Sequence, residues 1–302
     1  MDMNYNLDIM SKRIFDTLNK TDLIDISNKL KNIKGNTLVT GAGGSYVVAK
    51  FVAKVLENKN NIICEAISPR DILYKNLNNY NNIISASYSG NNYGVDVSLS
   101  NNLNKYLLSR NKKDGVINLN YINTDIEKSF ISLSSTMIPL SIMLNYYLDG
   151  NTSIIDEILS KDFNFKFKNK KVYEILSGVD STVASTFLDS TITEAGLGIP
   201  VLHDKYDFCH GRSTLGYVFD TNMIYINKDK ELDKLFINEL KKYYDDLIIL
   251  NKCYDDEIIN EYYLTYMSIY LCKYMAFIQN KDLSIVNYSE IVKKLYKYKG
   301  EM

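Results

Sequence analysis

The sequence predicts an α/β fold in which parallel strands alternate with helices that cover both faces of each sheet. Short apolar runs alternate with longer amphipathic segments along most of the 302 residues. Small or polar turns follow several of the predicted strands, and the same alternation starts again after residue 171. Strands joined by helical crossovers pair in parallel, and sheets of this kind are covered by helices on both faces. We therefore expect two α/β domains.

The first half supplies four strands with helices between them, preceded by a helical segment. Apolar residues recur at helical spacing over residues 7–30, which predicts one or two helices that pack as a cap. The predicted strands are apolar, partly β-branched runs at 37–40, 61–66, 82–86 and 115–120. The predicted helices are amphipathic segments at 45–56, 69–77, 94–108 and 129–148.

The second half repeats this order after a polar connection rich in Lys and Asn. Its predicted strands are 172–176, 199–202, 223–227 and 247–250. Its predicted helices are 181–197, 231–244 and 257–279. We therefore expect five segments: a helical cap (1–34), a first domain (35–150), a linker (151–171), a second domain (172–282) and a C-terminal tail (283–302). The repeated order suggests an ancient duplication.

Composition excludes several classes of function. The net charge of −1 provides no basic field for nucleic acid, and no apolar stretch approaches the length of a membrane span. The N-terminus has no basic and apolar leader, so a cytoplasmic protein is expected. The four cysteines are far apart and form no C-x-x-C pair, which predicts neither a metal site nor a disulfide framework. We expect no metal and no cofactor.

Two loops follow predicted strands and carry groups suited to an anion. Gly43, Gly44 and Ser45 lie between a strand and a helix, where small residues let backbone amides approach a phosphate. A tight turn without a ligand is the alternative. Ser87, Ser89 and Asn92 follow the third strand and offer two hydroxyls and an amide. Capping alone is again the alternative, but open α/β sheets bind ligands at the carboxyl ends of their strands.

The first glycine loop does not match a dinucleotide-binding fingerprint. That fingerprint requires glycine where Tyr46 stands, so a nicotinamide-dependent oxidoreductase is not favoured. Only a dinucleotide bound at residues 41–45 would favour that class.

A carboxylate and an imidazole lie sixteen positions apart, at Glu194 and His210, and the chain has only two histidines. An aldose–ketose shift needs one base that reaches two neighbouring carbons and an acid/base at the ring oxygen. A carboxylate held partly away from water has a raised pKa, which suits such a base. Glu194 as a solvated surface residue is the alternative. His203 is expected to be a loop residue satisfied by Asp204 or Asp207, or else to enter the pocket.

These residues together resemble the two-domain sugar isomerase (SIS) family. The resemblance rests on Gly43-Gly-Ser45, on Ser87-Tyr-Ser-Gly90, and on Glu194 with His210-Gly211. It extends from about residue 37 to the C-terminal tail. Within the family, the isomerase half of glucosamine-6-phosphate synthase, fructosamine-6-phosphate deglycase and amino-sugar-phosphate isomerases and deaminases have the most similar layout. The resemblance implies a five-stranded parallel sheet flanked by helices in each domain.

The resemblance also implies roles for particular residues. Glu194 corresponds to the base that moves a proton between C1 and C2, and His210 to the ring-opening group. The serine loop corresponds to the phosphate site, with Asn92 in place of the family's Thr. The family's His reaches into the neighbouring subunit's site, which implies a homodimer, or a larger assembly, with shared active sites. A Lys of the C-terminal tail lies over the sugar in the family, which points to Lys293 or, one register away, Lys294.

Three departures limit the resemblance. Thr191 stands where the synthase has a Lys one turn before its base, so the amine chemistry differs. Arg212 replaces the Pro that follows His-Gly and is a candidate for binding a carboxylate or second phosphate of the substrate. The second half has no S-x-S-G loop, so one phosphate site per chain is expected.

The sequence therefore predicts a metal-free enzyme that transfers a proton between C1 and C2 of a phosphorylated sugar. An amino-sugar phosphate or an Amadori-type sugar phosphate is the expected substrate, and isomerase, deaminase and deglycase reactions remain open. The alternative is a sensor or regulatory protein that binds a sugar phosphate without turnover. Neither nucleic acid nor a membrane is an expected partner.

Overall fold

The computed structural model describes residues 3–122, 133–178, 181–228 and 230–283. The chain divides into two compact units. One contains the described residues up to Asn151 together with Leu283, and the other extends from Thr152 to Asp282. In the part of the chain that is described, no helix has the length and apolar character to span a membrane.

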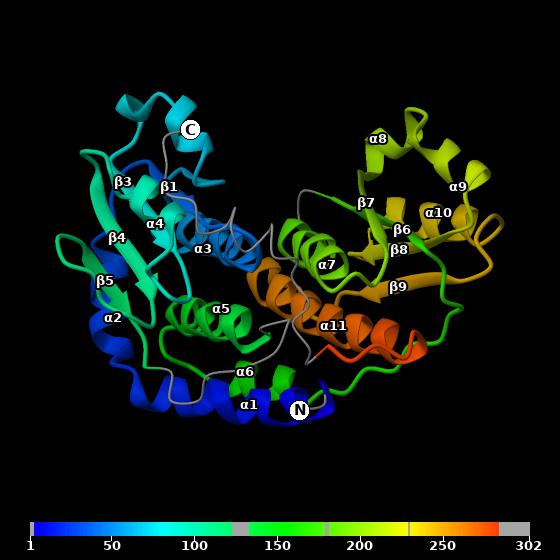
Figure 1. Cartoon of the computed structure of the whole chain (residues 1–302), viewed down its shortest axis with the longest axis horizontal. Helices are drawn as coiled ribbons and strands as arrows, with labels where there is room; N and C mark the ends of the chain where they lie inside the picture. Colours follow the sequence, from blue (N-terminus) through cyan, green and yellow to red (C-terminus); the bar gives the residue numbers. More distant parts are fainter. Residues whose placement is uncertain (1–2, 123–132, 179–180, 229, 284–302) are drawn as a thin grey trace. The chain divides into compact units, whose positions relative to one another are not determined.

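The first unit is built on a five-stranded parallel sheet, as expected (Figure 1). The spatial order of the strands is β2-β1-β3-β4-β5, so the chain runs from β1 to one edge and then returns to build the other side. The strands are β1 (Thr37–Thr40), β2 (Cys64–Ile67), β3 (Asn82–Ala86), β4 (Asn104–Ser109) and β5 (Ile117–Asn120). Because all pairs are parallel, the carboxyl ends of all five strands lie along one edge.

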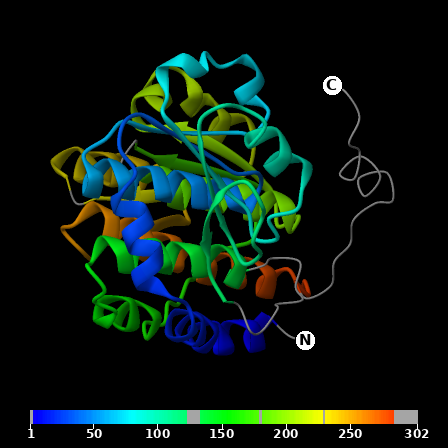
Figure 2. The ribbon, with the colours of Figure 1, turned by 90° about the vertical axis from the view of Figure 1, so that its left-hand side faces the viewer.

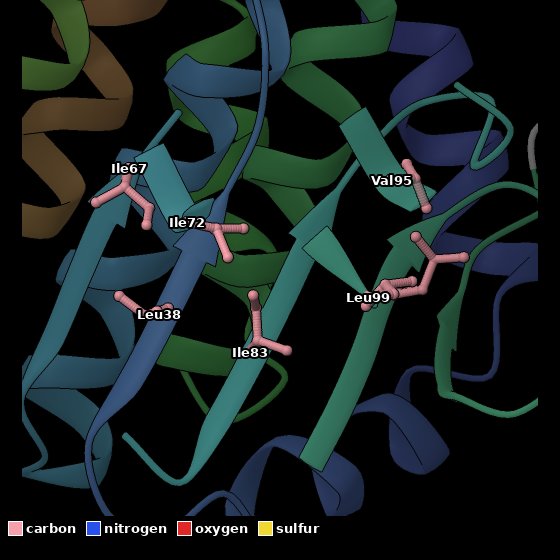
Figure 3. Packing of buried hydrophobic residues seen from close by; sticks show 7 residues of the cluster. Leu38, Ile67, Ile72, Ile83, Val95 and Leu99 are labelled. Atoms are coloured by element: carbon pink, nitrogen blue, oxygen red, sulfur yellow. The ribbon is translucent and has the colours of Figure 1, made fainter. Parts of the chain in front are cut away.

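Alternation of side chains along the strands gives this sheet two apolar faces. Leu38 of β1 and Ile83 of β3 pack with Val95 and Leu99 from the neighbourhood of α4 (Tyr93–Ser98), as Figure 3 shows. Short 3₁₀ helices cover the same face, η1 (Asp71–Tyr74) and η2 (Leu77–Asn79). Every residue of β1 and β3 is buried, and the apolar residues at the centre of each strand are flanked by buried Thr, Asn or Ser side chains.

The helices α3 (Gly44–Asn60) and α5 (Leu133–Tyr147) cover the opposite face. Figure 2 faces this unit and shows α3 above α5, with α1 (Met3–Lys20) beyond α5. The helix α2 (Leu23–Lys31) lies against β5 at the sheet edge, where the Lys29 ammonium donates to the Asn118 carbonyl at 3.0 Å. The predicted N-terminal cap is therefore two helices that complete the first unit.

The second unit has a four-stranded parallel sheet in the order β7-β6-β8-β9. Its strands are β6 (Val172–Ser177), β7 (Ile199–Asp204), β8 (Thr221–Asn227) and β9 (Leu247–Asn251). This order matches β2-β1-β3-β4 of the first unit strand for strand. The matched order supports the duplication suggested by the sequence.

Helices again cover both faces of the second sheet. Met223 and Tyr225 of β8 pack with Leu240 of α10 (Glu231–Leu240) and with Phe208 of α8 (Lys205–Cys209). The helices α7 (Thr182–Glu194) and α11 (Glu257–Ile278) pack together and contact β7 and β9, respectively. The helix α11 is buried along most of its length, so its many tyrosines belong to the core.

Several element predictions differ from the structure. The predicted helix 69–77 consists of the two short 3₁₀ helices η1 and η2. The predicted helix 94–108 is a short helix, α4, followed by the buried strand β4. The apolar run of β4 is too short for its period to distinguish a strand from a helical turn. The linker 151–171 contains the helix α6 (Ser153–Leu159), which packs against α11. Among the described residues, the second sheet has four strands instead of the five that the family resemblance implied.

Candidate functional site

The two predicted phosphate loops lie side by side at the carboxyl edge of the first sheet. Thr40, the last residue of β1, is paired with Ser85 of β3, so the loops that follow these two strands leave the sheet as neighbours. The Thr40 hydroxyl also donates to the Ser98 hydroxyl of α4 at 2.8 Å. This is the crevice at which the strand order reverses direction, the usual ligand position in open α/β sheets.

The glycine loop is a tight turn whose backbone geometry requires glycine. A Cβ at position 41 would lie 2.1 Å from the Ser45 carbonyl oxygen, and Gly43 has a φ of +56°. The N–H groups of Ser45 and Tyr46 donate to the Ala42 and Gly43 carbonyls, so the turn uses them internally. Gly43 is exposed and Gly44 begins α3, so an anion approaching this helix end meets little side-chain bulk.

The serine loop is held by hydrogen bonds that meet at one hydroxyl. The Ser87 Oγ accepts from the Gly90 N–H at 3.2 Å and from the Asn92 Nδ2 at 3.1 Å. The Asn92 Oδ1 in turn accepts from the Val95 N–H at 3.0 Å, which caps α4. A hydroxyl oxygen accepts through two lone pairs, so Ser87 has its own proton left to donate. Among the described residues no acceptor takes that proton. Ser87 itself is buried.

The end of β4 braces the serine loop from behind. The Ser109 hydroxyl donates to the Tyr88 carbonyl at 3.3 Å, and the Asn111 side chain donates to the Ser89 carbonyl at 2.8 Å. Gly90 has a φ of +69° and a Cβ there would lie 2.7 Å from the Ser109 Oγ, so only glycine allows this close approach. These bracing residues were not predicted, because residues 104–108 were assigned to a helix, although polar residues directly after the apolar run marked the end of a strand.

Glu194 is the last residue of α7 and is exposed. The expectation that the fold of the chain holds this carboxylate partly away from water is therefore wrong for the single chain. The end of a helix carries partial negative charge, so a carboxylate there is electrostatically unfavourable.

His210 caps the end of α8. Its backbone N–H donates to the Asp207 carbonyl at 3.0 Å, and the residue is exposed. Arg212 follows in a 3₁₀ turn and is exposed as well. Between Glu194 and His210 runs β7, a strand of six residues, which spans roughly 20 Å. The two predicted catalytic groups thus lie toward opposite ends of β7 in one chain, Glu194 before its first residue and His210 beyond its last.

His203 is a core residue of β7, and its predicted partners are wrong. The His203 Nε2 lies 3.2 Å from the Glu174 Oε2, and both side chains are almost fully buried. The other carboxylate oxygen, the Glu174 Oε1, accepts from the Thr221 hydroxyl at 2.7 Å and from the Tyr244 hydroxyl at 3.0 Å. Asp204 instead accepts from the Tyr206 N–H at 2.8 Å as the cap of α8. Glu174 in the middle of an apolar strand was the available signal that a buried partner was needed.

In the second unit, the position equivalent to the serine loop is occupied by the protein's own carboxylate. By strand order, β8 corresponds to β3. Beyond the end of β8, the buried Asp233 carboxylate accepts from the Lys205 Nζ at 2.5 Å and the Tyr225 hydroxyl at 2.6 Å. It also accepts from the N–H groups of Lys228 and Lys230, each at 3.1 Å. These donors are arranged like an anion-binding site, but the Asp233 carboxylate already occupies it.

The second unit also contains an apolar cavity of about 450 Å³. Aromatic and aliphatic side chains dominate its lining, including Phe208, Tyr217, Leu235 and Phe236. A sugar phosphate is strongly polar and needs hydrogen-bonding partners, so this cavity is less suited to it than the loops of the first unit.

Two predicted residues cannot be placed. Lys293 and Lys294 lie outside the described residues. Among the described residues, no group of three or more His, Cys, Asp or Glu side chains is arranged to hold a metal ion.

No protein-family model matches the sequence, and no curated protein matches it. Solved structures do match over nearly the whole length of the chain. Tagatose-6-phosphate ketose/aldose isomerase from Escherichia coli has a TM-score of 0.70 at 13% identity and covers 95% of this chain and 96% of its own. Glucosamine-6-phosphate deaminase from Thermotoga maritima has a TM-score of 0.66 at 17% identity, with coverage of 93% and 98%.

The C-terminal domain of glucosamine-fructose-6-phosphate aminotransferase from Francisella tularensis matches with a TM-score of 0.65 at 13% identity, covering 93% of this chain and 97% of its own. At these identities the likeness defines the fold. The chain has the two-domain α/β fold of phosphosugar isomerases, which confirms the resemblance to the SIS family at the level of fold.

Removing the internal carboxylate of the second unit should destabilise the protein. We expect Asp233→Asn to lower the free energy of unfolding by about 3 kcal/mol, because the Lys205 ammonium would be left buried without its counter-charge. Urea denaturation measures this change. The matched control is Glu239→Gln, which removes an exposed carboxylate paired with Lys242 and should change stability by less than about 1 kcal/mol.

The same variant should show a defined pH dependence. Burial acts to raise the pKa of Asp233, but hydrogen bonds from Lys205 and Tyr225 outweigh it and hold that pKa below its usual value. The stabilisation is therefore present above the unfolded-state pKa of about 3.9 and is lost as pH falls through the lower folded-state pKa. The stability difference between the parent and Asp233→Asn should narrow below about pH 4. A constant difference down to pH 3 would contradict this assignment.

Proposed function

We propose that the protein is a sugar-phosphate isomerase or a closely related amino-sugar-phosphate deaminase or deglycase. The observation that carries the proposal is the serine loop, in which Ser87 is buried, accepts two hydrogen bonds and retains its proton for a ligand. The adjoining glycine loop offers a helix end for the same anion. Phosphosugar enzymes with the same fold lend the proposal support.

In the proposed reaction, the Ser87 and Ser89 hydroxyls and the Asn92 amide bind the substrate's phosphate. His210 transfers a proton at the ring oxygen, which opens the sugar. The Glu194 carboxylate then takes the proton from one of the two carbons C1 and C2 and returns it to the other, through an enediol or enolamine. Arg212 is proposed as a contact for a second anionic group of the substrate, and Lys293 as a contact of the tail.

The proposed active site is shared between protomers of a homodimer. Glu194 and His210 of one chain lie toward opposite ends of β7, so one chain does not bring them together. A partner chain that donates its imidazole removes this difficulty. Burial of Glu194 by that assembly would also give the base the dry surroundings that the single chain does not provide.

A second candidate function is a non-catalytic sensor that binds a sugar phosphate. The exposure of both Glu194 and His210 in the single chain favours it, because a sensor requires the phosphate loop but not the proton-transfer groups. The two candidates differ in turnover, and both predict binding.

Solvent deuterium distinguishes the two candidates directly. We expect incubation in D₂O with fructose-6-phosphate, glucosamine-6-phosphate or an Amadori sugar phosphate to place deuterium at C1 or C2 of the sugar, because the abstracted proton exchanges with solvent. Mass spectrometry measures the incorporation, with and without ammonia. Binding of these compounds with neither exchange nor product would support the sensor, and absence of binding would reject both candidates.

Replacement of the base tests its role. Glu194→Gln should lower kcat by about a hundredfold or more while the Kd for the sugar phosphate stays within about threefold. Because Glu194 is exposed, the substitution should leave the protein folded, which the melting temperature checks. The control Glu239→Gln makes the same substitution at another exposed position of the second unit. Full activity of Glu194→Gln would show that another group is the base.

Removal of the buried hydroxyl tests the phosphate loop. Ser87→Ala should raise the Kd for a sugar phosphate by about tenfold or more, since a hydrogen bond to a charged ligand and the support of the Gly90 and Asn92 donors are lost together. Calorimetry measures the Kd. Ser100→Ala is the control, because the Ser100 hydroxyl donates to the Val97 carbonyl after α4, away from the loop. Equal affinities for the Ser87 variant and the parent would refute the phosphate site.

A further inference from the structure

Arg110 contacts the serine loop (residues 87–92) from the end of β4. It follows the last residue of β4, and its N–H donates to the Tyr88 carbonyl at 3.3 Å. The flanking residues Ser109 and Asn111 donate to carbonyls of the same loop. The backbone at position 110 is thus fixed against residues 88–89 from both sides.

The guanidinium of Arg110 is held at the loop by an aromatic ring. Its Cζ lies 4.9 Å from the centre of the Tyr88 ring, a distance at which a cation is attracted to the ring face. Burial raises the pKa of Tyr121, and the charge of Arg110 acts on that pKa in the opposite direction, so the guanidinium also lies near this buried phenol.

Ordinary packing does not explain this arginine. The Arg110 Nε is buried and has no hydrogen-bond partner, although buried donors in proteins are almost always paired. Within the part of the chain that is described, no carboxylate forms an ion pair with Arg110. The nearby Lys113, by contrast, is neutralised by Asp96 at 3.0 Å.

The two phosphate loops contain no positive charge of their own. Residues 41–45 and 87–92 are glycine, alanine, serine, tyrosine and asparagine. A phosphate monoester carries a charge between about −1.5 and −2 at pH 7. Neutral donors bind such a group, but a neighbouring cation adds a Coulombic attraction that falls off slowly in a partly buried site.

We propose that Arg110 supplies the positive charge of the phosphate site and selects phosphorylated ligands. Tyr88 orients the guanidinium, and the buried Nε is the donor that a bound phosphate or a water beside it satisfies. This inference rests on the proposed function, because it assigns a charge to the site proposed for the substrate's phosphate. The charge of Arg110 makes the serine loop selective for a dianion, whereas hydroxyl groups alone would bind any polar group.

The test asks whether Arg110 contributes to ligand binding through its charge or only through its packing. Inorganic phosphate and fructose-6-phosphate are titrated by calorimetry into the parent, Arg110→Gln, Arg110→Lys and the control Lys112→Gln, which removes an exposed cation two residues away. We expect Arg110→Gln to weaken both ligands by about tenfold, and Arg110→Lys to stay within about threefold of the parent. Lys112→Gln should bind as the parent does.

Two results would overturn the inference. One is parent-like affinity in Arg110→Gln, and the other is equal weakening in the Lys and Gln variants, which would assign Arg110 a packing role. If Arg110→Gln does not fold, Arg110→Met makes the same comparison, because it keeps an apolar stem against Tyr88 without the charge.

Ser87→Ala separates this inference from the proposed function. Weaker binding in the Ser87 variant together with parent-like binding in Arg110→Gln would reject the role of Arg110 and leave the proposed phosphate site in place. Absence of phosphate and fructose-6-phosphate binding in the parent protein would reject the phosphate site itself, and with it the inference.

Discussion

The parallel pairing of β1 with β3 is the constraint on which the candidate site depends. It places Thr40 opposite Ser85, so two loops more than forty residues apart in sequence leave the sheet at one point. The proposed phosphate site follows from that adjacency. It lets one phosphate reach both the first residues of α3 and the Ser87 hydroxyl, whose proton is available to donate. Burial of both faces of the sheet fixes the register, since a slip by one residue would turn Leu38 and Val39 toward the wrong faces.

The sequence predicted the fold class well because parallel strands buried on both faces leave a strong pattern. The strands 37–40 and 82–86 were predicted with the bounds that the structure shows, and both are apolar runs that end at turn residues. The strand β4 was missed because its apolar run, Tyr106-Leu-Leu108, is too short for its period to distinguish a strand from a helical turn. The helix α6 was missed because its polar flanks resemble a linker.

Side-chain partners were much harder to predict than elements. The sequence pointed to the serine loop but not to Ser109 and Asn111, which brace it from a strand that had been misassigned. His203 was given a neighbour in sequence, whereas its partner Glu174 is on the adjacent strand, 29 positions away. Such pairs are set by strand order, and strand order is invisible in the local pattern. The catalytic pairing proposed for Glu194 and His210 depends, in addition, on an assembly of two chains.

The six-residue length of β7 has a consequence for how such a protein behaves in the cell. If the imidazole of one chain serves the carboxylate of another, catalysis is a property of the pair, and dilution would silence the protein without unfolding it. A chain damaged at position 194 and a chain damaged at position 210 would then complement one another when mixed, restoring one intact centre in each hybrid. Selection would act on the contact between copies as strongly as on the chemistry.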